Sequence, residues 1–179
     1  MDSMEAREIP AYTECLAILR RHQNNERIIA HGRKVAEVGK RLACCLNAAG
    51  MKLNIDLVVA GGLLHDIAKG QRNHAGRGEK LMKAQGFETL AAIVGSHMDM
   101  DFSAESNLDE AAIVFLADKL VQEDRLASLA DRFLPALAKG SGSPEKLAAI
   151  TRRQRTAEAI SSRITELLGI SHLEEIALQ

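Results

Sequence analysis

The sequence of 179 residues contains no tryptophan, one tyrosine and four phenylalanines, so aromatic residues make up only 3% of it. Proteins that hold single-stranded nucleic acid stack the bases on exposed aromatic rings, and this chain has few rings to offer. The formal net charge of −1 provides no bulk attraction to nucleic acid or to anionic membranes. Small molecules are therefore the expected ligands, and neither nucleic acid nor a membrane is expected as a partner.

Cysteine is also scarce, and Cys15, Cys44 and Cys45 have no spacing typical of a metal site. An odd number of cysteines argues against the disulfide framework of a secreted protein, so we expect small buried apolar residues in helices. The longest apolar run, Leu57 to Leu64, has about eight residues, against the roughly 18 that a membrane span needs. The first residues show no signal-peptide pattern. These features predict a cytoplasmic protein.

Helical periodicity runs along almost the whole sequence, and no segment alternates as a strand does. Asn and Ser residues that can cap helices, and glycines that can end them, divide the chain. We predict helices over about residues 10–23, 25–50, 54–69, 74–85, 88–97, 107–125, 130–139 and 144–168. The predicted fold class is all-α, a single-domain helical bundle with a C-terminal helical extension. Its parts are an N-terminal helix (1–24), a central helical domain (25–139) and C-terminal helices packed on the same domain (143–179).

Histidines and aspartates lie on the apolar faces of these predicted helices. His65 and Asp66 follow the most apolar segment of the chain, while His31, His97 and Asp118 lie three or four positions from apolar residues. One inward histidine is ordinarily a hydrogen-bonded core residue. A buried lone carboxylate, however, costs several kcal/mol unless it is paired, hydrogen-bonded or bound to a metal. A shared divalent metal would account for all five residues together.

The order His31, His65-Asp66, Asp118 resembles the signature of the HD-domain metal-dependent phosphohydrolases, an all-helical superfamily. The string GLLHDIAK at residues 62–69 is similar to the central motif of many members, and ADKL at 117–120 is similar to the segment with the last ligand. The resemblance covers about residues 25–130. It implies an HD-type bundle in which the positions of His31, His65, Asp66 and Asp118 bind one metal.

Two further histidines, His74 and His97, resemble the pair that the two-metal branch carries between the central motif and the final aspartate. The string HAGRG at residues 74–78 is similar to a helix start in the bacterial diadenosine tetraphosphate hydrolases. This resemblance implies two metals, with Asp66 as the bridge because a carboxylate has two oxygens. Four histidines and two carboxylates favour iron, manganese, cobalt or zinc over magnesium or calcium. A solvated loop histidine is the alternative for His74.

The chemistry of such a site follows from charge. Two divalent cations about 4 Å apart can hold a bridging hydroxide, which attacks phosphorus, and they offset the charge that develops. Asp66 and Lys69 are the predicted catalytic residues. The resemblance implies that Lys69, the last residue of the central motif, contacts a substrate phosphate, and Arg125 is predicted to bind a second one because it lies two helical turns after Asp118. Alternatively, Lys69 is only a cation at a helix C-terminus, and Arg125 pairs with neighbouring acids.

The sequence thus predicts a hydrolase for a small phosphate-containing substrate, expected to be a nucleotide. A phosphomonoesterase, a phosphodiesterase and a dinucleoside polyphosphate hydrolase all remain open. The competing interpretation is a non-catalytic nucleotide-binding sensor or scaffold with a structural metal, but the complete set of ligands favours an enzyme. Asp99 and Asp101 are expected to be ordinary loop acids, and the basic run Arg152–Arg155 a solvated helix face. The oligomeric state is left open, a homo-oligomer included.

Overall fold

The computed structural model describes residues 9–103, 105–173 and 176, and its described part is helical apart from one small hairpin. The helices are α1 (Tyr12–His22), α2 (Glu26–Ala48), α3 (Ile55–Leu64), α4 (His74–Ala84), α5 (Glu88–Ser96), α6 (Glu110–Lys119), α7 (Leu129–Gly140) and α8 (Pro144–Leu168). Strands β1 (Val121–Gln122) and β2 (Arg125–Leu126) pair antiparallel between α6 and α7. The predicted all-α class is confirmed.

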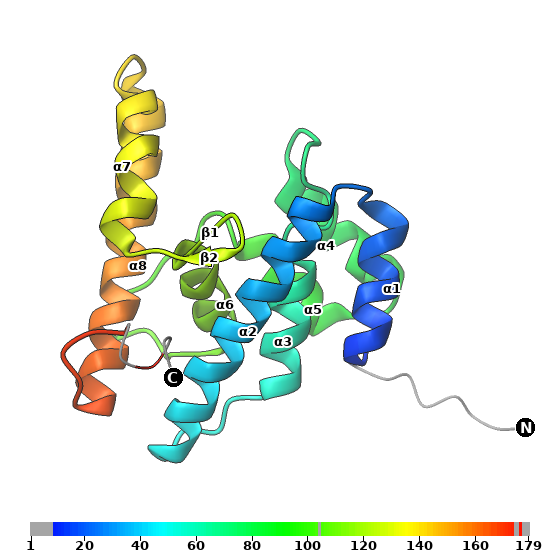
Figure 1. Ribbon diagram of the computed structural model, residues 1–179, viewed down its shortest axis with the longest axis horizontal. Helices are drawn as coiled ribbons and strands as arrows, with labels where there is room; N and C mark the ends of the chain where they lie inside the picture. The colour runs from blue at the N-terminus through cyan, green and yellow to red at the C-terminus, as the bar shows by residue number, and fades with distance from the viewer. Residues whose placement is uncertain (1–8, 104, 174–175, 177–179) are drawn as a thin grey trace, which may run out of the picture.

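Helix α2 runs through the middle of the fold and packs along α3 and α6 (Figure 1). Its first turn is capped by Asn25, whose side chain accepts a hydrogen bond from the backbone N–H of Arg27, and Asn54 caps α3 in the same way. The buried apolar side chains of α2 recur at helical spacing: Ile29, Val35, Val38, Leu42 and Leu46. The stripe begins at Ile29, because Ile28 is only half-buried.

Two glycines allow α2 and α3 to cross closely. A Cβ atom on Gly62 would lie 2.6 Å from the Cα atom of Ala36, and one on Gly32 would lie 2.9 Å from the carbonyl oxygen of Leu63. Glycine in a helix interior costs about 0.5–1 kcal/mol relative to alanine, so both positions give up helix stability for close contact. The crossing brings the first turns of α2 against the last turn of α3, where the histidines of the two helices meet.

The end of α6 differs from the prediction of a helix over 107–125. The helix begins after its N-cap Asp109 and ends at Lys119, and a hairpin follows with Glu123 in its turn at a φ of 57°. Every residue from Ala112 to Lys119 is buried. A continued helix would carry the charged run 123–125 into the core, where unpaired charges are costly. The chain therefore leaves the core as a hairpin, and the prediction of no strand was wrong here.

Helices α7 and α8 form an antiparallel pair that projects beyond the rest of the fold (Figure 1). As predicted, Ser143 caps α8, Pro144 occupies its first turn, and Gly169 ends it in the left-handed conformation. The C-terminal half of α8 adds Ile160 and Ile164 to the core beside α6 and α2. The division into ranges 1–24, 25–139 and 143–179 stays a prediction. No helix in the described ranges is both long enough and apolar enough to cross a bilayer.

The three cysteines differ in burial. Cys15 is buried in α1, Cys45 is partly buried and Cys44 is exposed. The expectation that all three are buried is therefore wrong for Cys44, which faces solvent because its neighbours Ala43 and Leu46 fill the inner face of α2.

Candidate metal centre

His65 and Asp66 begin a series of turns directly after α3, which ends at Leu64, earlier than the sequence predicted. The carbonyl oxygens of Ile67 and Lys69 accept hydrogen bonds from the side-chain amide of Gln23 at 2.9 and 3.0 Å. A continued helix would use these carbonyls for its own next turn. The contact with Gln23, from 44 residues earlier in the chain, thus favours turns that bring Asp66 and Lys69 together.

His65 is fully buried, and its Nδ1–H donates to the carbonyl oxygen of Gly62 at 2.8 Å. This bond fixes the ring with its Nε2 atom 3.5 Å from a carboxylate oxygen of Asp66 and 3.5 Å from one of Asp118. Burial alone lowers the pKa of His65, but the two carboxylates outweigh it and raise this pKa to about 10. A metal at Nε2 would displace that proton and take over the role of neutralising the carboxylates.

A first group of potential ligands consists of His31, His65 and Asp66, whose ligand atoms lie within 4.8 Å of one another. Asp118 adjoins it, because its Oδ1 atom is 3.0 Å from Nε2 of His31. The Nδ1–H of His31 donates to the carbonyl oxygen of Glu123 at 2.7 Å. A carbonyl accepts hydrogen bonds only, so this contact sets the tautomer that leaves Nε2 available. The hairpin after α6 therefore orients a ligand on α2.

A second group consists of Asp66, His74 and His97, again with ligand atoms within 4.8 Å of one another. The two Nε2 atoms are 3.2 Å apart, and they lie 3.2 Å (His74) and 3.4 Å (His97) from Oδ1 of Asp66. Nδ1–H of His97 donates to the carbonyl oxygen of Val94 at 2.6 Å. His74 occupies the first position of α4 and is part-buried, unlike a solvated loop histidine.

The donor atoms of this centre fit a divalent metal. Nε2 of His65 and Oδ1 of Asp66 are buried without a hydrogen-bond partner among the described residues. The histidines of the second group are close to Oδ1 but do not have the geometry of a hydrogen bond. Unsatisfied buried polar atoms cost about 1–3 kcal/mol each. Imidazole nitrogens and carboxylate oxygens are the donor atoms that first-row transition metals use. A metal bound here would therefore supply the partner that both atoms lack.

The electrostatics of the remaining ligands follow from burial and neighbouring charge. Burial raises the pKa values of Asp66 and Asp118, but nearby positive charge and close polar contacts outweigh it and hold both well below the usual range. For Asp66 the opposing groups are histidines, with His65 foremost. Burial lowers the pKa of His97. Both carboxylates are thus ionised and His97 is neutral near pH 7, which are the protonation states that metal binding requires.

Two lysines contact the carboxylates of the centre. Lys69, predicted from the sequence, donates from Nζ to Oδ2 of Asp66 at 2.9 Å, and its side chain remains half exposed. Lys119 was not predicted: its buried Nζ donates to Oδ2 of Asp118 at 2.8 Å and to the carbonyl oxygen of His97 at 2.6 Å. The sequence contained a signal for it, because this lysine directly follows Asp118 at the end of an apolar run.

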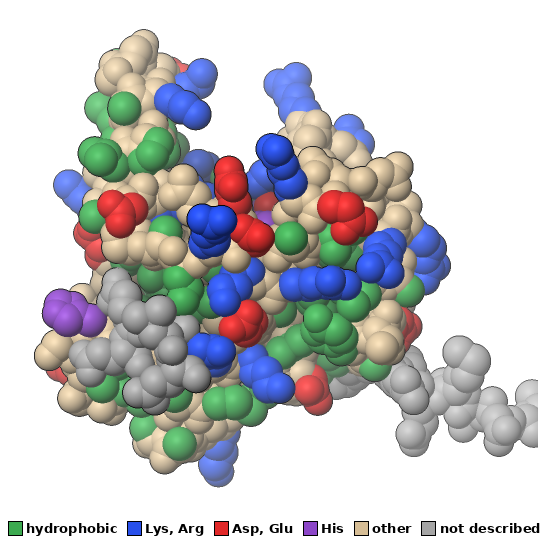
Figure 2. All heavy atoms as spheres, viewed as in Figure 1, with side chains coloured by type: hydrophobic (Ala, Val, Ile, Leu, Met, Phe, Trp, Pro, Cys, Tyr) green, Lys and Arg blue, Asp and Glu red, His purple; other side chains and the backbone are tan. Residues whose placement is uncertain are grey.

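The centre opens to solvent through a cavity of about 280 Å³ on the side of the first group. Arg125 does not line it, because that residue lies exposed on β2 rather than on an extension of α6. The prediction that Arg125 lies two helical turns after Asp118 was therefore wrong, because α6 ends at Lys119. The cations that do line the cavity are Arg27, Lys69 and Arg132. Figure 2 shows charged side chains around a hollow between the start of α2 and the hairpin, with a histidine visible in it.

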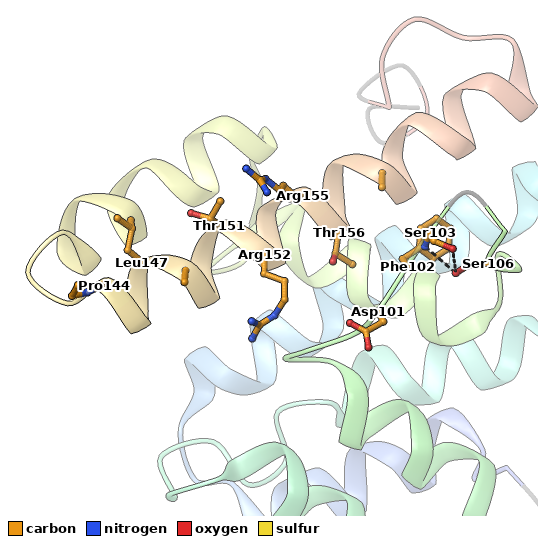
Figure 3. A pocket seen from close by; sticks show the side chains of 12 residues that line it. Asp101, Phe102, Ser103, Ser106, Pro144, Leu147, Thr151, Arg152, Arg155 and Thr156 are labelled. Atoms are coloured by element: carbon orange, nitrogen blue, oxygen red, sulfur yellow. Dashed lines mark hydrogen bonds between the residues drawn. The ribbon is translucent and has the colours of Figure 1, made fainter.

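Asp99 has a structural partner, whereas Asp101 is an exposed loop acid as expected. Asp99 accepts two hydrogen bonds of 2.9 Å from Arg153 and lies 3.6 Å from Arg152, which attaches the segment after α5 to α8. The basic run is thus only partly a solvated face. Arg152 and Arg155 border a second, open cavity of about 970 Å³, which Figure 3 shows between α8 and the residues around Asp101.

Comparison with known proteins adds to this geometry. The model of the family described as HD domain matches residues 28–135, a range that is more than half of the chain and contains the positions of the six predicted ligands. A tRNA (cytidine(56)-2'-O)-methyltransferase of Picrophilus torridus is 30% identical over 138 residues, which cover 68% of this chain and 39% of that protein.

An uncharacterized protein of Methanocaldococcus jannaschii is 28% identical over 102 residues, covering 55% of this chain and 60% of that protein. The chain therefore spans less than two thirds of the length of either curated relative. No solved structure matches the chain.

Proposed function

This chain belongs to the HD domain family, and on that premise we propose that it is a metal-dependent phosphohydrolase. Its substrate would be a phosphate ester or anhydride of a small molecule, with a nucleotide as the expected class. The observation that carries the proposal is the position of Asp66, which belongs to both groups of ligands. Its Oδ1 faces His74 and His97, and its Oδ2 faces His65. One carboxylate that serves two ligand groups is what a binuclear centre needs.

In this proposal His31, His65, Asp66 and Asp118 hold one metal, and Asp66, His74 and His97 hold the other. Bound divalent metals would supply Lewis acidity toward a phosphoryl oxygen and lower the pKa of water. With imidazole and carboxylate donors, iron, manganese, cobalt or zinc are the expected ions.

The protein itself contributes orientation. Hydrogen bonds from Nδ1 of His31, His65 and His97 to backbone carbonyls fix the three rings before any metal binds. Lys69 would contribute charge. Its Nζ is beside Asp66 and its side chain is half exposed at the mouth of the cavity, so it can move from the carboxylate to an incoming phosphoryl oxygen.

The name of the Picrophilus relative indicates methyl transfer to tRNA, and we do not propose that activity here. This chain covers only 39% of that protein. Its conspicuous site is a buried group of imidazoles and carboxylates rather than a surface for RNA. A sensor or scaffold with a structural metal would not need a half-exposed lysine at a cavity that opens directly on the ligands.

The proposal is tested by assaying purified protein for phosphate release from nucleoside monophosphates, diphosphates, cyclic nucleotides and a dinucleoside polyphosphate, with manganese, iron or cobalt added. We expect metal-dependent turnover that Asp66→Ala lowers by at least about 100-fold, because it removes a ligand shared by both metals. Asp56→Ala, the same change at an exposed position in the first turn of α3, is the control and should retain activity. Equal turnover by the Asp66 variant and the wild type would reject the assignment.

A further inference from the structure

The cavity over the first group of ligands has cations on several of its walls. Arg27 lies on α2 one turn before His31, Lys69 lies in the turns after α3, and Arg132 comes from α7. Lys69 contacts Asp66 directly. Arg132 has no hydrogen bond or ion pair with any ligand in the described ranges. The two residues therefore offer positive charge in one cavity, and of the two only Lys69 is paired with a carboxylate of the centre.

Other buried and part-buried cations have an anionic partner, but Arg132 has none among the described residues. Lys119 is paired with Asp118 at 2.8 Å, and Arg153 is held by Asp99 at 2.9 Å. For Arg132 the described residues provide no carboxylate within ion-pair distance, and its Nε is buried without a hydrogen-bond partner. A part-buried guanidinium with an unsatisfied donor is costly unless an acceptor is supplied.

We propose that Arg132 is a specificity-determining residue that binds the second of two adjacent phosphoryl groups, so that the substrate is a diphosphate or longer polyphosphate compound. The inference rests on the proposed function. With one phosphoryl group beside Asp66 and Lys69, the next phosphoryl group would supply the acceptor that Arg132 lacks. Guanidinium groups suit this role because their donors match the oxygens of a phosphate.

The size of the cavity agrees with this assignment. Its volume of about 280 Å³ is below the roughly 300–1,000 Å³ of pockets that enclose a whole drug-sized ligand. Linked phosphoryl groups would fill it, and the organic part of the substrate would extend beyond its mouth. A monophosphate would leave Arg132 without an anion, so the structure favours polyphosphate compounds over nucleoside monophosphates and cyclic nucleotides.

The test compares two ligands that differ by one phosphonate group and contain no bond that the enzyme could hydrolyse. Methylenediphosphonate and methylphosphonate are titrated calorimetrically into metal-loaded protein, and metal content is measured afterwards. We expect Arg132→Ala to weaken methylenediphosphonate binding by about tenfold or more, as loss of a charge-assisted hydrogen bond does. Methylphosphonate binding should change less than about twofold. Lys139→Ala, which removes an exposed charge from the end of the same helix, should affect neither ligand.

Three results would overturn the inference: equal losses for both ligands, no loss for either, or a wild-type protein that does not prefer the diphosphonate. Arg132→Gln keeps most of the side-chain volume and repeats the test if the alanine variant does not fold, as judged by circular dichroism. Failure of the proposed function gives a different pattern. A wild type without turnover, whose diphosphonate binding still depends on Arg132, would retain the anion site and reject the hydrolase.

Discussion

Replacing Lys119 by methionine is expected to destabilise the metal-free protein more than the metal-loaded protein. Lys119 is only 4% exposed, and its Nζ contacts Oδ2 of Asp118 at 2.8 Å and the carbonyl oxygen of His97 at 2.6 Å. Methionine has a similar length but no charge, so the carboxylate of Asp118 would remain buried without its cation. Removing one partner of a buried ion pair costs about 3–5 kcal/mol. We expect that loss in the free energy of unfolding of the metal-free protein.

In the metal-loaded protein the loss should be smaller. Asp118 faces His31 and His65 with its other oxygen, Oδ1, and a metal held there would neutralise the carboxylate in place of the lysine. What remains is chiefly the unsatisfied carbonyl oxygen of His97, which costs about 1–3 kcal/mol. The difference between the two states therefore measures how far the metal and Lys119 perform the same electrostatic task.

The assay is urea unfolding followed by circular dichroism, once with manganese and once with a chelator. Lys83→Met is the control, because Lys83 is an exposed residue of α4 that pairs with Glu79 on the surface, and it should unfold alike in both states. A loss for Lys119→Met that is the same with and without metal would refute the reasoning. It would show that Asp118 is not neutralised by a metal.

Two further predictions address the ligand groups and the helix crossing beside them. His74→Ala should remove about one equivalent of metal and leave the other in place, as elemental analysis would show; loss of both or of neither would contradict separate groups. Gly62→Ala should cost about 1–3 kcal/mol in urea unfolding, because its Cβ would lie 2.6 Å from Cα of Ala36, whereas Gly142→Ala, with no atom within 4 Å, should cost less.

Asp99 gives a prediction with a defined pH dependence. Hydrogen bonds and charge from Arg153 lower the pKa of Asp99 below its usual 3.8, so the stabilisation is present above about pH 4 and is lost as pH falls through the lowered value. Half of the Asp99 side chain is exposed, and exposed pairs contribute about 0–1 kcal/mol. Asp99→Asn should therefore lower the free energy of unfolding slightly at pH 7 and not at pH 2; a loss of equal size at both would refute the ion-pair explanation.

Much of the fold and the metal ligands was accessible from the sequence because helical spacing reports which face of a helix is buried. Asp118 is buried, as its spacing from apolar residues predicted, although the whole segment Ala112–Lys119 of α6 is buried as well. The caps Asn25, Asn54 and Ser143 fix where α2, α3 and α8 begin, because each replaces a missing backbone partner locally. Local signals of this kind need no knowledge of distant residues.

The features that the sequence did not predict depend on contacts between residues far apart in the chain. The early end of α3 depends on Gln23, and the orientation of His31 depends on a backbone carbonyl in the hairpin. Periodicity does not detect either contact. Arg125 was misplaced because extrapolating α6 ignored the cost of burying the charged run before it. Arg132 enters the cavity only through the packing of α7, and no motif marks it.

The metal content of the protein tests the central claim most directly. Purified protein is loaded with manganese, iron, cobalt or zinc, passed through a desalting column and analysed for metal per chain, alongside Asp66→Ala. A binuclear centre predicts about two equivalents in the wild type and a large loss from both positions in the variant, with its helical circular dichroism retained. A folded wild-type protein that retains no metal, or a variant that retains as much as the wild type, would contradict the account.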